Sequence, residues 1–341
     1  MKTNNLITLI FIFLPFVMFG QDITFSQPNE ASIILNPANA GSQYDLRATA
    51  NYRQQWRSVT SPYKTIAASF DGKAFSQGKT GSSLGAGLSI LSDGAGDGQL
   101  VTNQVNLYLS GRVLFSKVQS FSAGIYGGLV QRHINTNKLT WGNQFNGLVY
   151  DSNLPTGENF SSQSFFNSDF GTGIQWSYGQ GSTTLSSNDM FGAQAGFAVF
   201  HVNSPRTGFY QITDRRSMRY LFHFTGSYGM KNTNMQISPL FLFEKQGPAQ
   251  MVYFGTFIKY KLQESSKYTG YLNSRAVSLG GFIRGSDAVV IAAQCEIGQI
   301  GFGISYDINI SSLANVSSGK GGFEISLKYL PIRSTSASRL I

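Results

Sequence analysis

After a short apolar leader, the chain alternates between apolar and polar residues and contains no second long apolar run. A membrane-spanning helix needs about 20 consecutive apolar residues, and no stretch after Gly20 approaches that length. Alternation with a period of two is typical of β-strands with one apolar and one polar face. If such a chain enters a bilayer, its strands must close into a barrel, because an open sheet edge in lipid would leave backbone groups without hydrogen bonds.

The leader has the order of features of a secretory signal peptide. Lys2 supplies the positive charge, an apolar run follows from Leu6 to Phe19, and the small Gly20 precedes a polar segment. A segment with this order of charge, apolar core and small residue directs secretion and is removed from the mature protein. We therefore expect residues 1–20 to be a signal peptide and the mature chain to begin near Gln21.

The composition favours a membrane barrel over a soluble domain. Charged residues make up 13% of the chain, against roughly 25% in ordinary soluble domains. The net charge is +9, and removal of the leader takes away only Lys2, which leaves 9 − 1 = +8. The basic residues are scattered and form no stripe or arm, which speaks against a nucleic-acid partner. The single Cys295 excludes an internal disulfide.

Period-two segments recur along the whole mature chain. In the first, Leu46, Ala48 and Ala50 alternate with polar residues. One such segment would also suit a soluble β-sandwich, but we count fourteen between Leu46 and Leu330, the even number that bacterial single-chain barrels have. The sequence thus predicts an all-β fold, a transmembrane antiparallel β-barrel of about 14 strands. Residues 21–45 are expected to be an N-terminal periplasmic lead-in, 46–330 the outer-membrane barrel and 331–341 a C-terminal tail.

The lengths of the connections predict an orientation. Outer-membrane barrels have short periplasmic turns and long outer loops. The two longest connections, from His133 to Phe165 and from Val202 to Arg219, both follow odd-numbered predicted strands. We therefore expect the first strand to rise from the periplasm and the connections after odd-numbered strands to face outward.

Glycines are frequent on the polar faces of the predicted strands, although glycine normally weakens a strand. Small inward-facing residues relieve crowding where the wall curves, or leave room for a plug or a partner segment. The inward glycines are Gly85, Gly87, Gly124, Gly171, Gly173, Gly301 and Gly303.

Charged residues on the predicted inward faces are the candidates for lumen or partner contact. Inward positions of any barrel are polar and often paired across strands, so a structural ladder of charges is the competing interpretation. The candidates are Arg47, Arg53, Arg57, Arg112, Glu296, Asp307, Glu324 and Lys328.

Motifs for catalysis are missing from the sequence. His133, His201 and His223 lie far apart without HExxH spacing, and no GxSxG nucleophile elbow occurs. Each histidine is interpreted as a lone strand or loop residue. We expect no enzyme activity, no catalytic residues, no cofactor and no metal site.

Both ends of the mature chain carry motifs of a known family. Gln21 to Ser42 reads QDITFSQPNEASIILNPANAGS, Tyr52 to Trp56 reads YRQQW, and Tyr306 to Tyr329 reads YDINISSLANVSSGKGGFEISLKY. In its QD start, its FSQ, LNPAxAGS and YRxQW elements and its closing hairpin, the chain resembles the PorP/SprF family of Bacteroidetes outer-membrane proteins. It departs from the family pattern at Ile23, where proline is usual, and at Pro28, where an aromatic residue is common.

The resemblance implies a part of the type IX secretion system and of its gliding-motility relatives. Members of the family are membrane barrels linked to export or surface attachment of large proteins with a C-terminal sorting domain. The implied partners are a secreted adhesin, periplasmic or outer-membrane secretion subunits, and outer-membrane lipid. Residues alone leave a second function open, a diffusion channel for small solutes, because the inward faces are polar and carry arginines.

Overall fold

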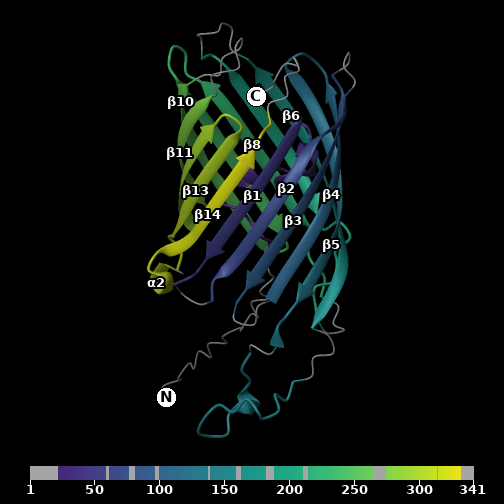
Figure 1. Ribbon diagram of the computed structural model, residues 1–341, viewed down its shortest axis with the longest axis vertical. Coiled ribbons are helices and arrows are strands. Elements are labelled where there is room, and N and C mark those ends of the chain that lie inside the picture. The colour runs from purple at the N-terminus through teal and green to yellow at the C-terminus, as the bar shows by residue number, and fades with distance from the viewer. Residues whose placement is uncertain are drawn as a thin grey trace, which may run out of the picture.

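The computed structural model describes residues 22–58, 61–76, 81–96, 100–136, 139–158, 163–181, 188–209, 214–263, 274–312 and 314–331. Fourteen strands form one closed antiparallel barrel in which each strand pairs with its neighbours in sequence and β1 pairs with β14 (Figure 1). The strands are β1 (Leu46–Gln55), β2 (Tyr63–Ser76), β3 (Ser83–Ala95), β4 (Leu100–Leu114), β5 (Gln119–His133), β6 (Ser164–Gln180), β7 (Phe191–Phe200), β8 (Arg219–Gly229), β9 (Met235–Gln246), β10 (Ala249–Gln263), β11 (Arg275–Arg284), β12 (Ala288–Ile297), β13 (Ile300–Asn309) and β14 (Lys320–Tyr329).

The predicted fold is confirmed in strand number and in closure. The period-two segments at Arg275–Arg284, Ala288–Ile297 and Ile300–Asn309 coincide with β11, β12 and β13, whereas β2 to β6 extend beyond the period-two segments at 63–71, 83–91, 101–112, 120–132 and 166–177. The ring closes where β1 pairs with β14, in a register that places Arg53 opposite Glu324. The predicted signal peptide, residues 1–20, and positions 332–341 of the predicted tail lie outside the described residues.

The two faces of each strand differ in polarity as the alternation predicts. On β4, Leu107 and Leu109 point outward with 65% and 61% of their surface exposed, while Asn106, Tyr108 and Ser110, which alternate with them, are buried on the lumen side. Apolar side chains that would be unfavourable in water are favourable against lipid tails. The wall therefore has the apolar outer surface of an outer-membrane barrel.

The barrel has two ends that differ in their connections. At one end, called here the terminal end, β1 begins and β14 ends. At the other, the loop end, lie the long connections after β5 and β7 and the one after β13, which contains the short helix α2 (Ala314–Ser317). The connection after β5 includes η4 (Gly142–Gln144) and reaches well beyond the wall, in teal at the bottom of Figure 1. Both long connections thus share the end that the sequence predicts to face outward.

The segment from Asp22 to Asp45, called here the plug, lies inside the barrel. It runs from the loop end to the terminal end through three short helical pieces, η1 (Pro28–Ala31), α1 (Ser32–Leu35) and η2 (Pro37–Asn39). This placement differs from the predicted periplasmic lead-in. The physical reason is that Phe25 and Ile33, with 5% and 0% of their surface exposed, pack against apolar residues of the lumen wall, where burial removes apolar surface from water.

None of the helices in the described ranges has the length and apolarity to cross a membrane.

Candidate functional site

Ser26 of the plug contacts a group of buried charged residues on the wall. Ser26 and these residues, Arg53, Arg284, Asp307 and Glu324, are called here the motif cluster. The Ser26 hydroxyl donates to Asp307 at 2.6 Å, and its backbone N–H donates to Glu324 at 2.6 Å. Arg53 donates to Asp307 at 2.9 Å, and Arg284 pairs with the same carboxylate. Two arginines therefore neutralise the aspartate that grips the plug.

The motif cluster brings together residues from four of the sequence motifs that resemble the family. Ser26 belongs to FSQ, Arg53 to YRQQW, Asp307 to YDIN and Glu324 to the EISL strand. At most 2% of the surface of any of these four residues is exposed, and buried charges persist only where they are paired and hydrogen-bonded. Residues that are as many as 298 positions apart in the chain thus share one electrostatic unit.

The second half of the plug is fixed by its backbone. Gly41 has φ +57°, a left-handed conformation that favours glycine, and its N–H donates to Asp71 at 2.8 Å. Asp71 also pairs with Arg47 at 2.9 Å. Arg112 donates to the carbonyl of Ser42 at 2.7 Å. The chain thereby turns from the plug into β1 at a fixed angle.

Asn36 and Pro37 press the middle of the plug against the wall. The Asn36 side chain accepts a hydrogen bond from the N–H of Ala38 at 2.9 Å and donates to the carbonyl of Ile174 on β6 at 3.0 Å. The Asn36 side chain therefore caps the N-terminus of η2 and also hydrogen-bonds η2 to the wall. His223 lies 3.0 Å from the same amide group. Asn36 and Pro37 therefore lie inside the lumen, against the wall.

Inward glycines let the plug approach the wall. An added Cβ at Gly124 would lie 2.5 Å from the Pro37 carbonyl oxygen, and one at Gly85 would collide with the Ala40 carbonyl. Added Cβ atoms at Gly173 and Gly303 would meet Asn36 and Gln27. The predicted use of these glycines, room for a plug or partner segment, is thus observed at four positions, whereas Gly171 faces Tyr126 of the wall.

Asp22 fastens the start of the plug at the loop end. Its carboxylate lies 2.5 Å from His201, 2.5 Å from Arg216 and 3.4 Å from Arg219. Burial alone would raise the pKa of Asp22, but the charges of Arg216, His201 and Arg219 hold it well below its usual range. Asp22 is therefore an anion in the folded protein, and His201, which also contacts Asp169 at 2.8 Å, is its partner.

A further ion pair anchors η1. Lys328 of β14 contacts Glu30 at 3.0 Å, and beside it Lys259 pairs with Glu296. Glu30 is buried, where a charged group needs an oppositely charged partner, and Lys328 is that partner. Both pairs lie toward the terminal end.

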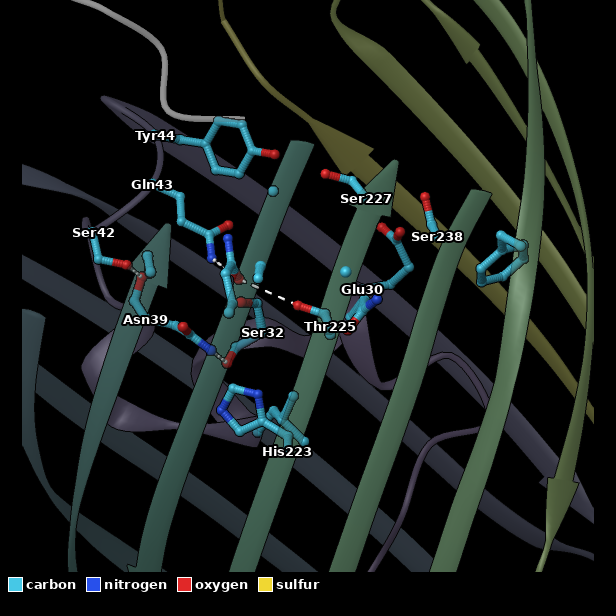
Figure 2. A pocket seen from close by; sticks show the side chains of 18 of the residues that line it. Glu30, Ser32, Asn39, Ser42, Gln43, Tyr44, His223, Thr225, Ser227 and Ser238 are labelled. Atoms are coloured by element: carbon cyan, nitrogen blue, oxygen red, sulfur yellow. Dashed lines mark hydrogen bonds between the residues drawn. The ribbon is translucent and has the colours of Figure 1, made fainter. Parts of the chain in front are cut away.

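The plug separates two cavities. The terminal-side cavity, about 240 Å³, is lined by Glu30, Ser32 and Tyr44 of the plug and by polar wall residues such as Thr225 (Figure 2). The loop-side cavity, about 380 Å³, includes Asp22 and Ile23 of the plug. No residue lines both cavities. Within the described ranges the plug therefore divides the lumen.

Seven of the eight charged candidates from the sequence lie on the inner wall. Arg47, Arg112, Asp307, Glu324 and Lys328 contact the plug directly. Arg53 acts through Asp307, and Glu296 pairs with Lys259. Arg57 lies beyond the end of β1 and is exposed. Most of the charged candidates thus contact the plug, a segment of the same chain.

Sequence reasoning missed Asp22, Glu30, His201, Arg216 and Arg219. The interpretation of His201 as a lone residue is wrong, because two aspartates flank its ring. The sequence signal for these contacts was weak, since it consisted of two acidic residues, Asp22 and Glu30, in an N-terminal segment rich in small and apolar residues. Across the described ranges, no group of three or more histidine, cysteine or acidic side chains is arranged to hold a metal ion.

Residues 17–329 match the family described as "Type IX secretion system membrane protein PorP/SprF". The chain belongs to the PorP/SprF family. This match spans the plug and the whole barrel, and with the closed barrel it places the protein in the outer membrane. No match was found among curated proteins.

Three solved structures illustrate the similarity to other barrels. The Pseudomonas putida toluene transporter TodX is 10% identical, with 87% of this chain and 91% of that chain covered and a TM-score of 0.44. The KdgM porin is 8% identical, with 84% and 99% covered and a TM-score of 0.35. BamA from Haemophilus ducreyi lacking POTRA domains 1–3 is 9% identical, with 84% and 70% covered and a TM-score of 0.41. Because these values are low, nothing about ligands or partners of this chain is taken from them.

Proposed function

We propose that this PorP/SprF protein is a non-enzymatic, plugged barrel that supports export or surface attachment of a large secreted adhesin with a C-terminal sorting domain. The observation that carries the proposal is the motif cluster. The motifs through which the sequence resembles its family supply the hydrogen bonds and buried ion pairs that hold the plug. A barrel whose family motifs hold a plug in the lumen is suited to binding a partner protein.

The two ends of the barrel offer different surfaces to partners. The loop end carries the long connections after β5 and β7, where Leu148 is 88% exposed, and is the proposed contact for the adhesin. The terminal end has a polar cavity and is the proposed contact for periplasmic or outer-membrane secretion subunits. Apolar residues exposed on long loops are suited to protein contact.

The test is deletion of the gene followed by complementation. Surface display of candidate adhesins is measured by labelling intact cells, with total adhesin measured in lysates. We expect the cognate adhesin to be lost from the surface and restored by the wild-type gene. Normal surface display of every sorting-domain protein in the deletion strain would refute the proposal.

The second candidate, a diffusion channel for small solutes, requires the plug to move, since it divides the lumen. Each cavity has polar lining residues of its own, and these favour the channel once the plug is displaced. Conductance of the purified protein in planar bilayers tests it. A steady ion current through the wild-type protein would support the channel, and a closed wild-type protein would favour the adhesin partner.

A further inference from the structure

The loop-side cavity has the size and position of a ligand site. Its volume of about 380 Å³ lies in the range of small-ligand pockets. It is bounded by the start of the plug and by the loop-end portions of β2 to β5 and β7 to β9. A ligand would enter it from the loop end.

Four arginines line this cavity, and two of them have no carboxylate partner among the described residues. Arg216 and Arg219 are occupied by Asp22. Arg132 donates to the carbonyl of Thr207 at 2.9 Å, which uses one of its five N–H donors. Arg215 is exposed. Two guanidinium groups are therefore available to an anion.

The acidic residue Asp93 also lines the cavity and limits where an anion can bind. It accepts a hydrogen bond from Thr65 at 2.6 Å. In the sheet it lies two strands from Arg132, with Thr102 between them in the same row. A bound carboxylate would avoid Asp93 and face the two free arginines.

One part of the remaining wall is apolar and aromatic, and it lies beside polar residues such as Gln104 and Asn106. Tyr108, Tyr126, Phe200 and Leu91 line it, and all four are buried. A ligand that fits both parts of the cavity combines carboxylates with apolar side chains. An inorganic anion would fill only the charged part.

The start of the plug already shows what this wall accepts. The Asp22 carboxylate is bound by Arg216, Arg219 and His201, and the next residue, Ile23, packs against the apolar cluster that contains Phe25 and Leu91. An acidic residue followed by an aliphatic one is thus bound by the same surface within the same molecule.

We propose that the loop-side cavity is a binding site for an acidic peptide segment, whose carboxylates pair with Arg132 and Arg215 while its apolar side chains contact the aromatic wall. The site lies within the barrel wall and opens at the loop end, so a peptide reaches it more readily than a lipid in the surrounding bilayer. The identification of that peptide with part of the secreted partner rests on the proposed function; binding itself does not.

The experiment is isothermal titration calorimetry of the purified full-length mature protein in detergent. The probe is a blocked tetrapeptide in which aspartate alternates with isoleucine, and its twin carries asparagine in place of aspartate. We expect the aspartate peptide to bind and the twin to bind at least tenfold more weakly. Arg132→Gln and Arg215→Gln should each weaken the aspartate peptide about tenfold, the effect of losing one charge-assisted hydrogen bond. Asp93→Asn should strengthen it by removing a repelling charge.

Arg57→Gln is the matched control, because Arg57 is an exposed arginine at the same end but outside this cavity. It should leave the affinity unchanged. Each variant is first compared with wild type by its migration on unheated gels, which reports a folded barrel. Equal binding of both peptides, unchanged affinity in both arginine variants, or full displacement by an equal concentration of inorganic phosphate would overturn the proposal. Adhesin display is measured independently, so the site and the proposed function can fail separately.

Discussion

Replacing Gly124 by alanine should push the plug away from the wall. The new Cβ would lie 2.5 Å from the Pro37 carbonyl oxygen, 2.6 Å from its carbon and 2.7 Å from the Ala38 nitrogen. All three are backbone atoms, so a side-chain rotation cannot relieve the clash. Overpacking of this kind costs roughly 1–3 kcal/mol. If that energy is borne by the seated plug, the ratio of displaced to seated plug rises roughly 5- to 150-fold.

The measurement is the open probability of single barrels in planar bilayers, compared with wild type and with Gly301→Ala. Gly301 is a suitable control because it also faces inward, but its added Cβ would meet the flexible side chain of Lys328 at 3.2 Å instead of plug backbone. We expect Gly124→Ala to open more often and Gly301→Ala to behave like wild type. A folded Gly124→Ala barrel that opens no more often than Gly301→Ala would refute the reasoning.

Three further predictions concern the fastening of the plug. Asp307→Asn removes the carboxylate that Arg53 and Arg284 share and leaves Arg284 only its contact with Asp287 at 3.5 Å. The free energy of unfolding, measured by urea titration in detergent or lipid, should therefore fall by about 3–5 kcal/mol; a fall below about 1 kcal/mol would contradict this. Burial opposes both shifts, but Arg216, His201 and Arg219 lower the pKa of Asp22, and the carboxylates of Asp22 and Asp169 raise the pKa of His201 above its usual value. The contribution of Asp22 is therefore lost only in strong acid, and that of His201 is lost as the pH rises through its raised pKa. Hydrogen exchange at the start of the plug should accelerate beyond the intrinsic rate as the pH rises through the pKa of His201, and His201→Asn should abolish this pH dependence. Asn36→Ala removes the cap of η2 and should cost about 1 kcal/mol, seen as faster protease cleavage of the plug; unchanged cleavage would exclude a role for the cap.

Period-two alternation predicted the wall well because every strand has lipid on one side and a polar lumen on the other. The bounds where β11, β12 and β13 meet are visible in the sequence because the two connections between these strands are tight turns, which contain Gly285 and Gly298. Strands such as β6 were underestimated because they continue past the apolar band, where alternation no longer reports burial.

The plug could not be placed from sequence. Its helical pieces have three or four residues, too few to show a periodicity, and the two carboxylate partners of Ser26 lie more than 280 residues away. The glycines on inward faces were the accessible signal, since room for a plug or a partner segment was one of the two uses expected for them. The charged residues of the wall were likewise identified by their face, but their partners were not, because pairing depends on which segment fills the lumen.

The contact between Ser26 and Glu324 spans 298 residues and constrains how the molecule is assembled. The seam between β1 and β14 closes the ring, and the plug segment that contains Ser26 lies inside it. The two sides of the Ser26–Glu324 contact can therefore meet only when the plug and the last strand are both in place. Sealing the cylinder and enclosing the plug are thus linked steps of its biogenesis.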